Sequence, residues 1–170
     1  MLLHEFISEL TIEIKNRFNI TISKTNIVDL DSSTNTKFSR HLIVHMPTGE
    51  LFADAVTCGI FVKRFIGRLA EDVATGEMIH KSPTLANHLF LYAKELPEDD
   101  KGKTDERPKT CFVDTGVYTR NRIFRLLQSM KYGKPSSAAL RIAAANQFPF
   151  PQNFTTSNED DAEVRICSIV

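Results

Sequence analysis

The segment KFSRH contains three polar side chains that could form one row of hydrogen-bond donors. Ser39 and His41 lie two positions apart, so on a β-strand they project from the same face, and Lys37 joins them if the strand begins early. A hydroxyl, an imidazole and an ammonium in one row suit the oxygens of a triphosphate, with charge-assisted bonds from Lys37 and protonated His41. Spacing alone favours a plain solvated strand face. A Ser–His nucleophile pair is disfavoured because alternate side chains on a strand lie about 7 Å apart.

A second group of candidate residues follows the apolar segment CFVD. Asp114 ends this predicted strand and precedes the turn residue Gly116. A carboxylate at a strand end can hold a divalent metal, which takes oxygen ligands and some of them from phosphate. Arg120, Arg122 and Arg125 come next, and the planar guanidinium matches phosphate oxygens. This set suits nucleotidyl or phosphoryl transfer, but an aspartate that caps a turn, with arginines on a solvated face, fits the spacing equally well.

The balance of charge indicates no partner for the chain as a whole, because 21 Lys and Arg residues offset 21 Asp and Glu residues. One segment departs from this balance, since no acidic residue occurs between Asp114 and Glu159. Such a basic segment attracts phosphates if its cations share one face. The cations are Arg120, Arg122, Arg125, Lys131, Lys134 and Arg141.

Other possible metal ligands give weaker signals. Asp29 and Asp31 have the spacing of a carboxylate pair on a strand, but the Ser-Ser-Thr that follows Asp31 favours a turn cap. The three cysteines are far apart and form no CxxC motif, so we expect no zinc in this chain. No apolar run has the length needed to span a membrane.

Apolar periodicity predicts a mixed α+β fold rather than regular βαβ units. We expect helices over residues 2–18 and 55–74, the second after a strand-like start. We expect strands at NIVDLD, at FSRHLIVHM, at the buried segment TCFVD and over residues 122–131, and an exposed charged loop over residues 94–109.

Two long strings carry a resemblance to a known family: LDSSTNTKFSRHLI and FVDTGVYTRNRIFRLLQSMKYGK. Over roughly residues 1–150 the chain resembles the eukaryotic primase-polymerase (PrimPol) family of the archaeo-eukaryotic primase superfamily. The resemblance implies an RRM-like mixed or antiparallel sheet with flanking helices. It also implies DNA primase and DNA-directed DNA polymerase activity, with repriming and translesion DNA synthesis in the nucleus and the mitochondrial matrix. The implied partners are Mn²⁺ or Mg²⁺, a DNA template and primer, nucleoside triphosphates and a single-stranded-DNA-binding protein.

The resemblance also assigns roles to individual residues. Ser39 and His41 match the family's SxH motif, and Asp114 matches its third metal carboxylate, so these three are the expected catalytic residues. Ile123 departs from the family pattern, which has a polar residue there. The expected nucleotide- and phosphate-binding residues are Lys37, Ser39, His41, Arg122, Arg125 and Lys131.

Two parts of the family pattern have no match in this sequence. The metal-binding DxE motif lies upstream of LDSST in the family, and a Cys/His zinc module lies downstream of the catalytic core. We therefore expect residues 1–170 to form a partial primase-polymerase catalytic domain, the C-terminal part of the core. A catalytically inactive nucleotide- or DNA-binding remnant of the family is the alternative.

Overall fold

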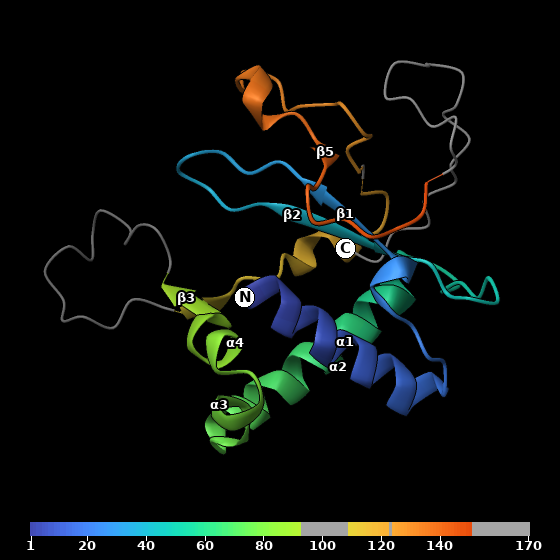
Figure 1. The fold of residues 1–170 in the computed structure, drawn as a ribbon, viewed down its shortest axis with the longest axis vertical. Helices are drawn as coiled ribbons and strands as arrows, with labels where there is room; N and C mark the ends of the chain where they lie inside the picture. Colours follow the sequence, from blue (N-terminus) through green and yellow to red (C-terminus); the bar gives the residue numbers. More distant parts are fainter. Residues whose placement is uncertain (93–108, 123, 151–170) are drawn as a thin grey trace, which may run out of the picture.

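Two long helices form one layer of the computed structural model, which describes residues 1–92, 109–122 and 124–150 (Figure 1). Helix α1 (Leu2–Phe18) buries an apolar stripe and ends at Asn19, whose left-handed φ of 58° stops the helix. Helix α2 (Ala55–Ala74) begins at Asp54, whose carboxylate accepts a hydrogen bond from the Thr57 amide at 2.7 Å. Both predicted helices are confirmed. The predicted strand-like start is wrong, because residues 51–54 lead into the cap of α2 instead.

Charged residues as well as apolar ones hold the two helices together. The Arg68 guanidinium of α2 donates to Glu13 at 2.8 Å and to Glu9 at 3.2 Å, and both acids lie on the buried side of α1. The rings of Phe6 and Phe65 meet between the helices with centroids 5.5 Å apart. The pairing of these buried carboxylates with a guanidinium offsets part of the desolvation cost of burying them.

An antiparallel hairpin lies across the helix layer. Strand β1 (Ile27–Asp31) pairs with β2 (Arg40–Val44), from Ile27 opposite Val44 to Asp31 opposite Arg40. The same register continues to a bridge between Thr34 and Lys37, which closes the turn. The short strand β5 (Arg141–Ile142) pairs with the other edge of β1, so the sheet order is β2-β1-β5. The first two predicted strands are confirmed, although β2 begins two residues later than expected.

The hairpin has two buried faces. On the helix face, Ile27, Leu42 and Val44 pack with the core of α1 and α2. On the opposite face, Val28, Leu30 and Ile43 pack against Leu140. That side is covered by the segment after residue 124, drawn in orange in Figure 1, so we call it the loop face. The alternation of a strand therefore sends neighbouring residues to different surroundings.

A second, smaller unit extends from the end of α2. It comprises α3 (Glu77–Lys81), α4 (Pro83–His88) and a two-stranded antiparallel sheet of β3 (Phe90–Tyr92) and β4 (Lys109–Cys111). Three short 3₁₀ turns complete the described elements: η1 (Lys24–Asn26), η3 (Thr115–Tyr118) and η4 (Ser136–Ala138).

Two predicted strands are corrected by the structure. The segment TCFVD is not a buried strand that ends at Asp114, because β4 ends at Cys111 and its first two residues are exposed. The strand predicted over residues 122–131 is also wrong, since none forms in the described residues 124–131. Gln128 there has a left-handed φ of 66°, which breaks an extended chain, and Leu126 is 79% exposed. An apolar run of this kind predicts burial, but it does not decide whether the segment pairs with a sheet edge.

The coarse fold prediction is confirmed, because the structure combines helices with small antiparallel sheets. The charged loop predicted over 94–109 lies outside the described residues, apart from Lys109 at the start of β4. None of the described helices is at once long enough and apolar enough to cross a membrane.

Candidate functional site

Lys37, Ser39 and His41 of KFSRH lie on the loop face of the hairpin. The register places Lys37 opposite Thr34, Ser39 opposite Ser32 and His41 opposite Leu30. These odd-numbered residues of the second strand alternate with Arg40, which points to the helix face. The predicted row of hydroxyl, imidazole and ammonium is therefore assembled, with Lys37 at the exposed end of the hairpin.

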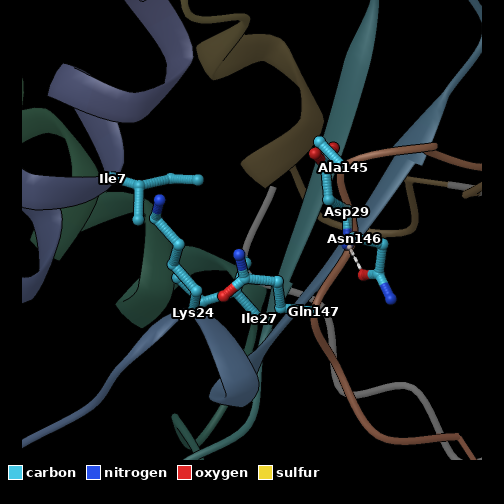
Figure 2. Close-up of a pocket in the computed structure, with 7 residues that line it drawn as sticks. All are labelled: Ile7, Lys24, Ile27, Asp29, Ala145, Asn146 and Gln147. Carbon is cyan, nitrogen blue, oxygen red and sulfur yellow. Dashed lines mark hydrogen bonds between the residues drawn. The ribbon is translucent and has the colours of Figure 1, made fainter.

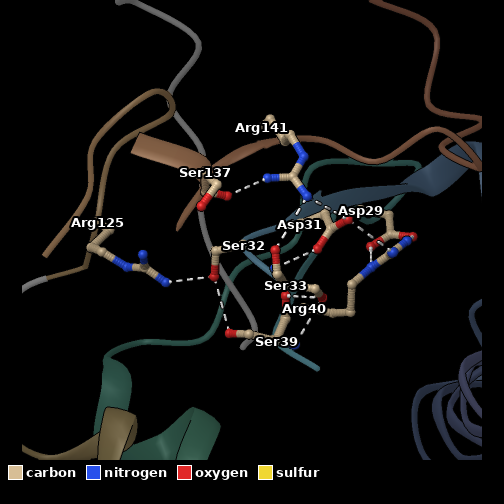
Figure 3. Close-up of polar contacts among 9 residues, drawn as sticks. All are labelled: Asp29, Asp31, Ser32, Ser33, Ser39, Arg40, Arg125, Ser137 and Arg141. Atoms are coloured by element: carbon tan, nitrogen blue, oxygen red, sulfur yellow. Dashed lines mark hydrogen bonds and ion pairs between the residues drawn. The ribbon is translucent and has the colours of Figure 1, made fainter. Parts of the chain in front are cut away.

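A continuous set of hydrogen bonds links this row to the segment after η3. The Arg125 Nη2 atom lies 3.0 Å from His41 Nε2 and donates to Ser32 Oγ at 2.9 Å. Ser32 Oγ in turn donates to Ser39 Oγ at 3.0 Å. Figure 3 shows Arg125, Ser32 and Ser39 in line. Arg125 is 84 positions from His41 and 93 from Ser32, so the fold alone brings them together.

The charges that act on His41 identify the residues around it, which we call the His41 cluster: Lys37, Asp114, Arg125 and Lys131. Burial lowers the pKa of His41 below its ordinary value of 6.5, and the positive charges of Arg125, Lys131 and Lys37 lower it further. The negative charge of Asp114 acts in the opposite direction. Five residues predicted from the sequence thus lie close enough to influence one another. The lowered pKa favours the neutral form of the His41 imidazole in the ligand-free chain, and a charged His41 donor stays a prediction.

Asp114 takes the turn-cap role, one of the two alternatives that the sequence left open. It is exposed, and its Oδ1 accepts a hydrogen bond from the Gly116 amide at 2.9 Å, which caps the η3 turn. Its Oδ2 has no hydrogen bond within the described part of the chain. A Cβ atom on Gly59 of α2 would lie 2.6 Å from Tyr118 Cβ, so the glycine permits η3 to pack on the helix and fixes the position of Asp114.

The basic segment does not form one surface. Arg125 and Lys131 act on His41. The pKa of Asp54 at the start of α2 is lowered chiefly by hydrogen bonds from Thr57, and the charge of Arg120 adds a smaller effect. Arg141 lies 3.4 Å from Asp31 on the helix face. Arg122 is exposed, and its side chain makes no hydrogen bond or ion pair to any described residue. The structure therefore brings two of the six cations to the His41 cluster and directs two elsewhere.

The aspartates of DLD form ion pairs on the helix face. Arg40 donates through Nε to Asp29 at 2.9 Å and through Nη2 to its other oxygen, and Nη1 lies 3.6 Å from Asp31 (Figure 3). Burial tends to raise the pKa of Asp31, but hydrogen bonds from Ser33 and the charges of Arg40 and Arg141 lower it overall. The Ser33 amide donates to Asp31 at 2.7 Å, so the turn-cap prediction is confirmed.

A small cavity adjoins Asp29 but cannot hold a nucleotide. Its volume is about 30 Å³, and Figure 2 shows Lys24 and Asn146 among the side chains around it. Across residues 1–92, 109–122 and 124–150, no three His, Cys, Asp or Glu side chains come together as a metal-binding cluster. Asp114 therefore belongs to no cluster of three such side chains among the described residues.

The Ser–His nucleophile alternative has no support in the geometry. The hydroxyl of Ser39 is bonded to Ser32, and the Nε2 atom of His41 faces Arg125. Sequence reasoning missed Ser32, which is only 6% exposed. The signal that could have found it is the hairpin register, because a two-residue turn at Asn35-Thr36 places Ser32 opposite Ser39.

Comparison with known proteins agrees with the sequence resemblance, although no family model matches the chain. The DNA-directed primase/polymerase protein of Danio rerio is 32% identical over 94% of this chain. The proteins of the same name from Bos taurus and Homo sapiens are each 30% identical, over 84% and 79% of this chain. The chain spans 30–32% of the length of these relatives. The predicted resemblance is thus confirmed: the chain is a homologue of the vertebrate DNA-directed primase/polymerase proteins over about a third of their length.

Proposed function

We propose that this chain supplies part of the nucleotide-binding and catalytic site of a DNA primase and DNA-directed DNA polymerase. The observation that carries the proposal is the cluster around His41. Three cations and one exposed carboxylate, from three separated segments of the sequence, act on this single imidazole. In the proposed reaction, a 3′-hydroxyl attacks the α-phosphate of a nucleoside triphosphate and pyrophosphate leaves.

Each residue of the cluster has a proposed task. Lys37, Arg125 and Lys131 balance the negative charge of the triphosphate and hold its orientation. Ser39 and His41 donate hydrogen bonds to phosphate oxygens from the loop face. Arg122, which is free in the described structure, would join them when nucleotide or DNA is bound. These cations stabilise charge that develops as the phosphate bond breaks.

Asp114 is the proposed metal ligand. Its exposed Oδ2 suits Mg²⁺ or Mn²⁺, which take oxygen ligands and keep several waters or phosphate oxygens. The ion would neutralise phosphate charge and activate the primer hydroxyl. Since Asp114 is a single ligand here, other oxygens must come from the nucleotide and from groups outside the described residues.

The wider role of the protein is proposed from the resemblance and from the names of its relatives. It comprises template-directed DNA synthesis on an RRM-like sheet, repriming and translesion synthesis during the DNA damage response, and action in the nucleus and the mitochondrial matrix. A single-stranded-DNA-binding protein is the proposed protein partner. An inactive nucleotide- or DNA-binding remnant is the second candidate, favoured because the described residues contain no cluster of three or more possible metal ligands.

Nucleotide titration and primer extension distinguish the two candidates. The full chain is titrated with a deoxynucleoside triphosphate, with and without Mn²⁺, and compared with Asp114→Ala. Affinity that rises with Mn²⁺ and loses that rise in Asp114→Ala supports the enzyme site. Extension of a primed template that Asp114→Ala abolishes would establish activity for this chain. Salt-sensitive DNA binding without any metal dependence would favour the remnant instead.

A further inference from the structure

Ser32 is a buried serine to which no sequence motif gives a role. It connects Arg125, which contacts His41, with Ser39 of the second strand. Its hydroxyl accepts from Arg125 at 2.9 Å and donates to Ser39 at 3.0 Å. We propose that Ser32 is a positioning residue of the phosphate site, through which Arg125 directs the Ser39 hydroxyl toward a bound phosphate. This inference rests on the function proposed above.

The direction of the hydrogen bonds follows from the donor inventory. A guanidinium can only donate, so Ser32 must accept from Arg125 and must use its own single hydrogen for another partner. That partner is Ser39 Oγ. Ser39 then receives a hydrogen bond, and its own hydrogen has no acceptor within the described part of the chain. The Ser39 hydroxyl is thereby left as a donor, which is what a phosphate oxygen requires.

The same guanidinium sets the donor atom of His41. Arg125 Nη2 lies 3.0 Å from His41 Nε2, and because arginine cannot accept, Nε2 must be the acceptor. The hydrogen of the neutral imidazole is therefore on Nδ1, which has no hydrogen bond to any described residue. Arg125 thus prepares two neutral donors, one through Ser32 and one directly, in addition to its own charge.

Burial explains why this arrangement is fixed before ligand binds. Ser32 is 6% exposed, and the backbone of the same residue donates to Ser39 O at 2.9 Å, so the two serines are held by main chain and side chain together. A polar group in such a place loses its bond to Arg125 only at the cost of an unsatisfied hydroxyl. Preorganised donors avoid that reorganisation when phosphate arrives.

Binding of inorganic triphosphate to the full chain tests the role of Ser32. We expect Ser32→Ala to weaken binding about fivefold, the effect of one neutral hydrogen bond. Ser82→Ala is the matched control, because Ser82 is 4% exposed and bonds Glu9 in the helix layer. It should leave the affinity unchanged. In a Ser39→Ala background, Ser32→Ala should change the affinity less than twofold, whereas additive losses would overturn the proposal.

The ¹⁵N shifts of His41 give a second test that needs no ligand and no change at Ser32. We expect hydrogen on Nδ1 in the unmodified chain and a shift toward Nε2 in Arg125→Met. Hydrogen on Nε2 in the unmodified chain would contradict the hydrogen bond assigned between Arg125 and His41, and with it the donor role given to Arg125. If the unmodified chain does not bind triphosphate, the proposed function is contradicted. If it binds triphosphate and Ser32→Ala leaves the affinity unchanged, only the proposed role of Ser32 is contradicted.

Discussion

Both faces of the β1–β2 hairpin carry arginine side chains, but the groups that these arginines contact differ between the faces. On the helix face, the carboxylates of Asp29 and Asp31 pair with Arg40, and Asp31 also pairs with Arg141, so two positive charges balance two negative ones. On the loop face, the hydrogen-bond partners of Arg125 among the described residues are neutral, namely Ser32, His41 and the Ala138 carbonyl, and further cations lie nearby. Cations paired with acids hold a fold together. Cations that surround neutral donors leave an excess of positive charge, which an anion can neutralise.

The largest expected effect comes from breaking the balanced face. Asp29→Ala removes the main partner of a guanidinium whose side chain is 17% exposed, and should lower the free energy of unfolding by about 3 kcal/mol. Urea denaturation measures the loss. The double variant Asp29→Leu, Arg40→Met should recover most of it, because no unpaired buried charge remains. Equal losses in both variants would contradict the ion-pair account.

A substitution in α2 tests how Asp114 is held next to the loop face. Gly59→Ala places a methyl group 2.6 Å from Tyr118 Cβ and should destabilise the chain by about 2 kcal/mol. Gly67→Ala is the matched control in the same helix. Nothing lies within 4 Å of its added Cβ atom, so it should stabilise by up to about 1 kcal/mol. Thermal unfolding of both variants decides, and equal effects would refute close packing of η3.

Arg125→Met should show that the loop face serves binding more than stability. We expect at least about a tenfold loss of nucleotide affinity, the effect of one charge-assisted bond. The change in unfolding free energy should stay within about 1 kcal/mol, since the partners of Arg125 are neutral and no unpaired charge remains in the variant. Calorimetric titration and urea denaturation measure the two quantities. Arg120→Met, in the same basic segment, is the control and should retain affinity.

The smallest expected effect is a pH dependence from His41. Its pKa is lowered in the folded chain, so the unfolded chain binds more protons as the pH falls below about 6.5. Stability should therefore decrease on acidification from pH 7, and His41→Gln should reduce this slope. Triphosphate should raise the pKa of His41, which an NMR titration can follow. A pKa that stays the same or falls on binding would show that phosphate does not approach the imidazole.

The elements that depend on local pattern were predictable from sequence. Helical periodicity placed α1 and α2 at their observed bounds, and strand alternation put Ser39 and His41 on one face. The strand predicted over residues 122–131 failed because β-structure needs a partner edge, and an apolar run does not reveal whether one exists. The prediction of a buried strand before Asp114 was wrong for a related reason. Among the described strands β4 pairs with β3 alone, and its first two residues remain exposed.

The sequence by itself determined the family, the two main helices and the row of Lys37, Ser39 and His41. Each of these depends on a short motif or on the local repeat of a helix or strand. Only the tertiary structure decided what these residues meet. It directed Arg125 to Ser32 and His41, Arg40 to Asp29, and Arg141 to Asp31. Such contacts join segments far apart in the chain. Which arginine finds which partner depends on how sheet, loop and helices pack together, and no local pattern contains that information.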